Sequence, residues 1–156
     1  NYAKAFGMRV IAWSHNLKQE DCEKVGVEYV KSDDLFKMSD VLTIHTRLSD
    51  RTRDYIDKNK LNLMKKRSVI VNTSRGPIIK EQHLIDALNN NVISCAALDV
   101  YDQEPLPIDH VLRNTKNLIL TPHIGYVSEE TYEKFFTGYL SAINAFINKN
   151  PINQIL

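Results

Sequence analysis

Glycine, cysteine and long apolar runs are all scarce in this chain of 156 residues, and neither sign of charge is in excess. No apolar run approaches the roughly 20 residues that a membrane helix needs, and the N-terminus has no apolar signal-like core behind a basic head. Lys and Arg number 20 against 19 Asp and Glu, so the net charge of +1 gives no electrostatic reason to expect nucleic acid or a membrane as partner. We therefore expect a cytoplasmic globular protein.

The chain has only two cysteines, Cys22 in a polar helical stretch and Cys95 in an apolar one. They lie far apart in the sequence and do not have the spacing of metal ligands, so we expect free reduced thiols. No cluster of His, Cys and carboxylate residues has metal-ligand spacing either, and we predict no metal site.

Strand-like and helix-like segments alternate along the whole chain. Ser32–Leu35 opens one helix, Asp57 or Asn59 opens another, and the apolar spacing within residues 80–90 predicts a third. Strands covered by intervening helices on both faces form a doubly wound parallel sheet, so we predict an α/β, Rossmann-like fold. The expected strands are Met8–Ser14, Val27–Val30, Val41–His45, Ser68–Asn72, Ser94–Asp99 and Asn117–Thr121.

The five glycines are dispersed and form no GxGxxG turn, the element that lets a backbone approach a pyrophosphate. Residues 1–7 are typical of the last turns of a helix that ends at Gly7. We therefore predict that residues 1–127 are a partial dinucleotide-binding domain, truncated at its N-terminus and without its first strand and Gly-rich turn. Residues 128–156 are predicted to form a long, mostly buried C-terminal helix, with a capping box at Ser128.

Three short stretches each begin where a strand-like run ends: Asn72–Gly76, Leu98–Pro105 and Thr121–Gly125. In an open parallel sheet the carboxyl ends of the strands form the edge where ligands bind. The three stretches include the Arg75 guanidinium, the carboxylates of Asp99 and Glu104, and the His123 imidazole. That set can hold a carboxylate and move a proton at the neighbouring carbon.

In order, these motifs resemble those of the D-isomer-specific 2-hydroxyacid dehydrogenases. The resemblance implies that Arg75 binds the substrate carboxylate and that His123 exchanges the hydroxyl proton while Glu104 orients its ring. It also implies that residues 128–156 pack on, or return to, a substrate domain that is absent here. A parent enzyme of this kind transfers a hydride between a nicotinamide cofactor and a small 2-hydroxyacid or 2-oxoacid, and we expect the isolated chain to be inactive.

Further residues are expected at the cofactor. At the end of the expected strand Met8–Ser14, Ser14 and His15 stand where NAD enzymes normally place an acidic residue against the ribose, so the resemblance favours NAD while NADP stays open. Thr46 lies in a loop that matches the family's adenine-side loop. The resemblance extends the set of cofactor-binding residues to Thr73, Ser74, Arg75, Asp99, His123 and Gly125.

One alternative function and one assembly complete the expectations. Transcriptional corepressors share this fold and these residues, so a non-catalytic NAD(H)-sensing protein is the alternative function. The resemblance also implies a homodimer. It does not say which 2-hydroxyacid is the substrate or in which direction the reaction runs.

Overall fold

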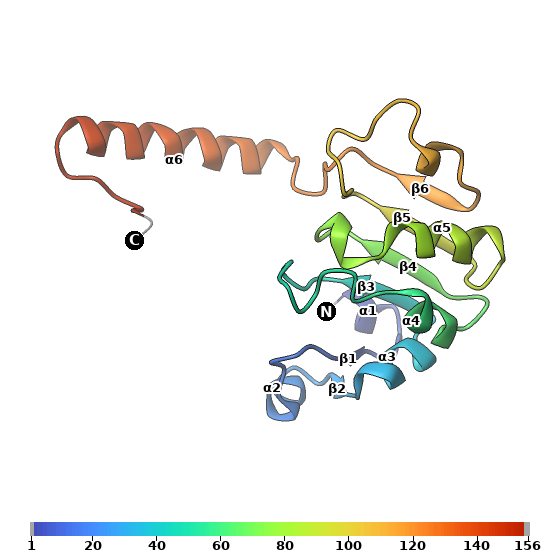
Figure 1. The fold of residues 1–156 in the computed structure, drawn as a ribbon. Coiled ribbons are helices and arrows are strands. Elements are labelled where there is room, and N and C mark those ends of the chain that lie inside the picture. The colour runs from blue at the N-terminus through green and yellow to red at the C-terminus, as the bar shows by residue number, and fades with distance from the viewer. Residues whose placement is uncertain (1, 155–156) are drawn as a thin grey trace. The chain divides into compact units, whose positions relative to one another are not determined.

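The computed structural model describes residues 2–154, and these form two compact units, one ending at Pro122 and the other beginning at His123. Within the first unit, six short parallel strands form two sheets (Figure 1). One sheet pairs β1 (Ile11–Ala12) with β2 (Glu28–Tyr29). The other has the order β3-β4-β5-β6, and its strands are Val41–Ile44, Val69–Asn72, Cys95–Leu98 and Leu118–Leu120.

All six strands lie within the ranges expected from the sequence, and all pairs are parallel, so the predicted α/β class is confirmed. The strands are shorter than expected because pairing stops where the flanking loops turn away. Asn72 of β4 pairs with Ile44 and with Leu98, which brings the carboxyl ends of β3, β4 and β5 into register.

Helices connect the strands, and α3, α4 and α5 pack side by side in the first unit (Figure 1). The Asp57 carboxylate accepts a hydrogen bond from the Lys60 backbone N–H at 3.0 Å, which settles that Asp57 rather than Asn59 caps α4. Gly7 has a φ of 72°, as expected of a C-terminal helix glycine. The helices of this unit are α1 (Tyr2–Ala5), α2 (Gln19–Lys24), α3 (Ser32–Met38), α4 (Lys58–Leu63) and α5 (Glu81–Asn89).

The hydrophobic core lies between the four-stranded sheet and helices α3 to α5. Ile70 and Ala96 of the central strands are fully buried, and Leu61, Leu84 and Leu88 pack on them from the helices. Two short 3₁₀ helices, η1 (Gly76–Ile78) and η2 (Val111–Asn114), follow β4 and precede β6 and were not predicted. The first lies in the loop after β4, and the second lies in the loop between β5 and β6.

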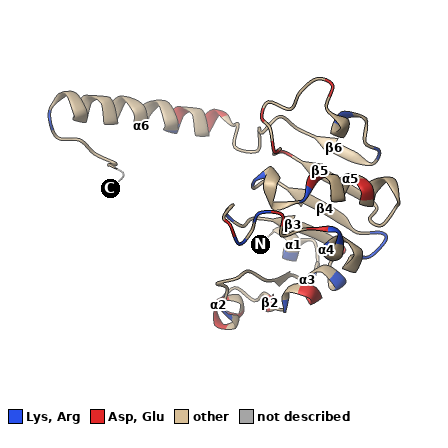
Figure 2. Cartoon of the chain, in the orientation of Figure 1, with Lys and Arg blue, Asp and Glu red and all other residues tan. Residues whose placement is uncertain are grey.

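The second unit consists of a short loop and helix α6 (Glu129–Ile147). Ser128 caps the helix as predicted, since its hydroxyl accepts a hydrogen bond from the Thr131 N–H at 3.2 Å. The expectation of a mostly buried helix is wrong, because none of its side chains is buried. Beyond its first turns α6 carries no charged residue (Figure 2), and its exposed aromatic side chains include Phe136, Tyr139 and Phe146.

No helix in the described residues is both long and apolar enough to cross a membrane.

Candidate active site

Asn72, the last residue of β4, organises the loop that carries Arg75. Its side chain is 1 % exposed and bonds in both directions, accepting from the Ser74 N–H at 3.0 Å and donating to the Arg75 carbonyl at 2.9 Å. A buried amide must be satisfied, and here the loop backbone provides the partners. The Arg75 side chain is exposed and donates to the Ser74 carbonyl at 2.6 Å, so a fixed loop presents its guanidinium at the carboxyl edge of the sheet.

The same loop is tied to the loop after β3. The Ser74 hydroxyl donates to the Thr46 carbonyl at 2.5 Å. Thr46 and Ser74, two residues expected at the cofactor, are therefore neighbours. Thr73 lies between Asn72 and Ser74 and is exposed.

Asp99 follows β5 and is nearly buried, at 6 % exposure. Its N–H donates to the Asn72 carbonyl at 3.0 Å, and its carboxylate accepts from the Thr121 hydroxyl at 2.5 Å. A buried carboxylate needs such partners. Asp99 thus links the ends of β4, β5 and β6 in one row.

Tyr101 adds two hydrogen bonds to this row of strand ends. Its hydroxyl lies 2.7 Å from the Thr121 carbonyl and 3.2 Å from the Leu98 carbonyl, and it donates to this pair of oxygens. Burial raises the pKa of Tyr101, and the nearby Asp99 carboxylate acts in the same direction. The phenol therefore keeps its proton at neutral pH and remains a donor.

Glu104 is placed by Tyr101 as well. Its Oε1 accepts from the Tyr101 N–H at 2.9 Å, and the following Glu104–Pro105 peptide bond is cis. The Arg75 and Glu104 loops meet at Gly76, because a Cβ there would lie 2.1 Å from the Tyr101 carbonyl carbon and 2.6 Å from the Asp102 nitrogen. A glycine is thus required for the two loops to lie this close.

His123 and Gly125 belong to the second unit and are described with it. His123 has a φ of 56°, in the left-handed region that few non-glycine residues adopt. Its ring meets the Tyr126 ring edge-on, with 5.9 Å between centroids. Within the first unit the structure brings Arg75, Asp99 and Glu104 to one edge.

Ser14, His15 and Thr46 line a different feature, a largely apolar groove of about 810 Å³ bordered by β1 and β3. The Trp13 ring stacks on Tyr55 with centroids 5.2 Å apart and planes 13° apart, and the His15 ring packs against both. The hydroxyls of Ser14 and Thr46 suit ribose oxygens, and no acidic side chain lies among residues 12–16. The residues present therefore fit the sugar of a dinucleotide.

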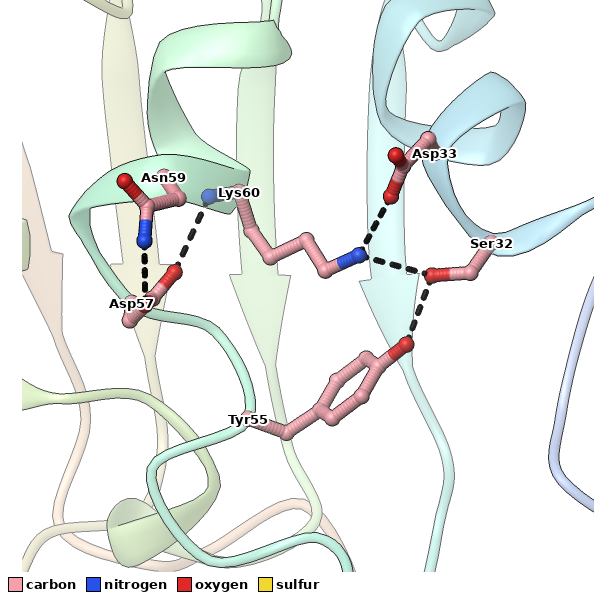
Figure 3. A network of polar contacts seen from close by, with 6 residues as sticks. All are labelled: Ser32, Asp33, Tyr55, Asp57, Asn59 and Lys60. Carbon is pink, nitrogen blue, oxygen red and sulfur yellow. Dashed lines mark hydrogen bonds and ion pairs between the residues drawn. The ribbon is translucent and has the colours of Figure 1, made fainter.

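Tyr55, which lines this groove, is fixed by a polar network (Figure 3). The hydroxyls of Tyr55 and Ser32 lie 2.6 Å apart, and the Lys60 ammonium contacts Ser32 at 3.1 Å and Asp33 at 2.5 Å. Burial alone lowers the pKa of Lys60, but the Asp33 carboxylate and Tyr55 outweigh it and raise that pKa. The charged lysine thus anchors the aromatic cluster to α3.

Sequence reasoning missed the residues that hold the edge together, Asn72 and Tyr101, because it looked for reactive groups. One signal was available for Asn72, since a polar residue that ends an apolar strand needs a local partner. His83 and His110 are partly exposed, and each accepts a backbone hydrogen bond, from Lys58 and from Leu112 respectively. Within residues 2–154 no three His, Cys, Asp or Glu side chains are grouped so as to hold a metal ion.

Comparison with known proteins assigns the chain. Residues 1–125 match the family model described as D-isomer specific 2-hydroxyacid dehydrogenase, NAD binding domain. A glyoxylate reductase of Aeropyrum pernix is 44 % identical over 128 residues, which are 82 % of this chain and 38 % of that protein. A hydroxypyruvate reductase of Blautia hydrogenotrophica is 35 % identical over 153 residues, which are 98 % of this chain and 47 % of that protein.

Solved structures agree with these relatives. A phosphoglycerate oxidoreductase of Vibrio cholerae has a TM-score of 0.88 and 31 % identity, with 95 % of this chain and 48 % of that one covered. A D-lactate dehydrogenase of Aquifex aeolicus, solved with NAD and lactic acid, has a TM-score of 0.83 and 28 % identity, with 96 % and 49 % covered. The chain thus spans less than half the length of each of these proteins, and it belongs to the D-isomer-specific 2-hydroxyacid dehydrogenase family through its NAD-binding domain.

Proposed function

We propose that the chain is part of an NAD-dependent oxidoreductase that interconverts a 2-oxoacid and a 2-hydroxyacid. The observation that carries this proposal is the exposed Arg75 guanidinium, held at the carboxyl edge of the sheet by the buried Asn72. A planar, permanently charged fork on a rigid loop suits a bidentate grip on a carboxylate. Relatives named as glyoxylate and hydroxypyruvate reductases support a small 2-oxoacid as the substrate class.

The proposed roles follow the chemistry of each group. When bound, the nicotinamide cofactor supplies or accepts the hydride at the carbonyl carbon. Arg75 binds the substrate carboxylate, and His123 gives its proton to the carbonyl oxygen in reduction and takes it back in oxidation. Glu104 orients the imidazole ring, as the family resemblance implies. Asp99, with its buried carboxylate, supports the nicotinamide end together with Thr73, Ser74 and Gly125.

We assign Ser14, His15 and Thr46 to the adenosine half of the cofactor. The groove that they line supports this assignment, as does their place after β1 and β3. NAD is favoured by the family, and the absence of an acidic residue among residues 12–16 keeps NADP as the alternative to be measured.

Domain organisation is part of the proposal. Residues 1–127 form a dinucleotide-binding domain whose first strand and glycine-rich turn lie outside these 156 residues, so the isolated chain is inactive. The exposed apolar side chains of α6 support the view that residues 128–156 pack on the substrate domain. We also propose a homodimer, which sedimentation of the full enzyme tests. The proposed location is the cytoplasm, which agrees with the free thiols of Cys22 and Cys95.

The test uses the full enzyme and 2-oxoacid-dependent NADH oxidation. Arg75→Met removes a charged hydrogen-bonding pair worth about 1.5–3 kcal/mol, so kcat/KM falls by about ten- to hundred-fold. Arg53→Met, at an exposed arginine of a neighbouring loop, is the matched control and leaves kcat/KM unchanged. Equal activity of the Arg75 variant and the wild type overturns the assigned role. Saturable NADH binding without turnover of any 2-oxoacid favours the NAD(H)-sensing alternative.

A further inference from the structure

The Glu104 loop, residues 102–110, lies between β5 and η2 and is closed on itself by backbone carbonyls. The Arg113 guanidinium donates to the Pro107 carbonyl at 2.8 Å and to the Leu106 carbonyl at 2.7 Å. The His110 N–H donates to the same Pro107 carbonyl at 3.2 Å. Hydrogen bonds from a charged donor are the stronger kind. The backbone that follows Glu104 is therefore tied to the position of His110.

The His110 ring connects this loop to helix α5. Its Nδ1 accepts a hydrogen bond from the Leu112 N–H at 3.4 Å and so caps η2. Because Nδ1 accepts, the neutral ring carries its proton on Nε2. That nitrogen lies 3.4 Å from Oε1 of Glu81, the first residue of α5. The two side chains are only 23 % and 25 % exposed, so their interaction is screened less than that of an exposed pair.

Glu81 also belongs to the Arg75 segment, residues 75–81. The chain passes from Arg75 through η1 directly into α5. Glu81 and Gly76 line one small cavity of about 10 Å³, which has room for no more than one water. The contact between Glu81 and His110 therefore joins the Arg75 segment to the Glu104 loop a second time, in addition to their close approach at Gly76.

Glu81 needs this partner because its carboxylate is partly withdrawn from water. Burial raises the pKa of Glu81, His110 lowers it, and the Asp102 carboxylate raises it further. A buried carboxylate is costly unless a donor or an opposite charge faces it. His110 therefore supplies the favourable contact that offsets both the burial of Glu81 and its repulsion by Asp102.

We propose that Glu81 and His110 are positioning residues, which hold the Glu104 loop against the Arg75 segment and so place the Glu104 carboxylate. That this carboxylate orients an imidazole rests on the proposed function, whereas its placement rests on the contacts described above. The structure contains a reporter of that placement, because Glu104 Oε1 accepts the hydrogen bond of the Tyr101 N–H at 2.9 Å. If the loop shifts, this hydrogen bond weakens.

The first test follows the Tyr101 amide by NMR in the full enzyme, without cofactor or substrate. Glu81→Leu removes the carboxylate, and His110→Asn keeps an oxygen that can cap η2 but does not reach Glu81. In both variants the Tyr101 amide proton should shift upfield and exchange about five- to ten-fold faster, as expected for the loss of about one net hydrogen bond. A loss of global stability alone also speeds exchange at Ile70 in β4, but it leaves the native chemical shift of Tyr101 unchanged. A wild-type Tyr101 shift in both variants overturns the proposal.

The second test uses the kinetics of the 2-oxoacid reaction. In Glu81→Leu and His110→Asn we expect kcat to fall about ten-fold, since a small displacement of an orienting group is costly, while KM changes little because Arg75 keeps its place. The double variant should be no slower than either single variant, because both remove the same contact. Glu81→Gln keeps an oxygen that can face Nε2 and should restore kcat. An unchanged kcat in the single variants, or losses that multiply in the double variant, overturn the positioning role.

Glu20→Leu is the matched control. Glu20 is exposed in the first turn of α2, so the same substitution removes the same charge from the start of a helix without touching either loop. It should leave both the Tyr101 shift and kcat unchanged. A full enzyme that turns over no 2-oxoacid contradicts the proposed function, and the Tyr101 shift then still decides whether Glu81 and His110 place Glu104.

Discussion

Replacing Gly76 with alanine is expected to separate the two loops of the candidate site. The added Cβ would lie 2.1 Å and 2.4 Å from the carbonyl carbon and oxygen of Tyr101, and 2.6 Å from the nitrogen of Asp102. These are backbone atoms, and they are held in place because the Tyr101 hydroxyl is bound to the end of β6 and the Tyr101 N–H to Glu104. Relief therefore requires movement of a whole loop rather than rotation of a side chain.

The expected loss in the free energy of unfolding follows from that geometry. Inserting one methyl group into a packed site costs about 1–3 kcal/mol, and the rigid neighbours place Gly76→Ala at or above the upper end, about 3 kcal/mol. For a chain of this size about 2–4 °C is lost per kcal/mol, so the melting temperature falls by about 6–12 °C. Urea unfolding gives the free energy, and amide exchange at Ser74 and Tyr101 reports the loosening of the two loops.

Gly138→Ala is the matched control. Gly138 lies inside α6, and a Cβ there meets nothing within 4 Å. The same chemical change therefore stabilises the helix by about 1 kcal/mol, because alanine is the better helix former. If Gly76→Ala unfolds at the same urea concentration as the wild type, the close approach of the two loops is not what holds them, and the reasoning fails.

Two further predictions concern hydrogen bonds. Asp57→Ala removes the cap of α4 and costs about 1 kcal/mol at pH 7. The Lys60 N–H lowers the pKa of Asp57, so the cap stabilises the fold above the unfolded pKa of about 3.9, and this stability is lost as the pH falls through the lower folded pKa. The urea midpoints of the variant and the wild type should therefore converge near pH 2. A difference that persists there contradicts the assignment of the cap. Tyr101→Phe removes a donor to two carbonyls and costs about 1 kcal/mol in urea, and no loss in its midpoint rules out the anchoring role of the phenol.

The strands and most helices could be read from the sequence because their signals are local. β-branched runs predict β3 and β4, and the capping residues Asp57 and Ser128 mark their helix starts correctly. Strand lengths could not be read in the same way. They depend on where the neighbouring strand ends, which is a property of the partner and not of the run itself.

The candidate site shows the same contrast between features with a local signal and features set by distant segments. The positions of Arg75, Asp99 and Glu104 after β4 and β5 could be predicted because each follows a strand-like run, and their roles stay predictions. The bonds that hold them, Asn72 to its loop and Asp99 to Thr121, join segments up to 22 residues apart and leave no periodic trace. For α6, the many apolar residues predict burial, whereas the structure buries none of its side chains.

A row of hydrogen bonds runs from Thr46 through Asn72 and Asp99 to Thr121 and holds the loops at this edge of the sheet. The residues that form this row are partly or fully buried, whereas the Arg75 side chain is exposed. The Arg75 side chain takes no part in the row, so it can be exchanged without loosening these bonds. An edge built in this way can change its outward-facing side chains while the fold that carries them bears little of the cost.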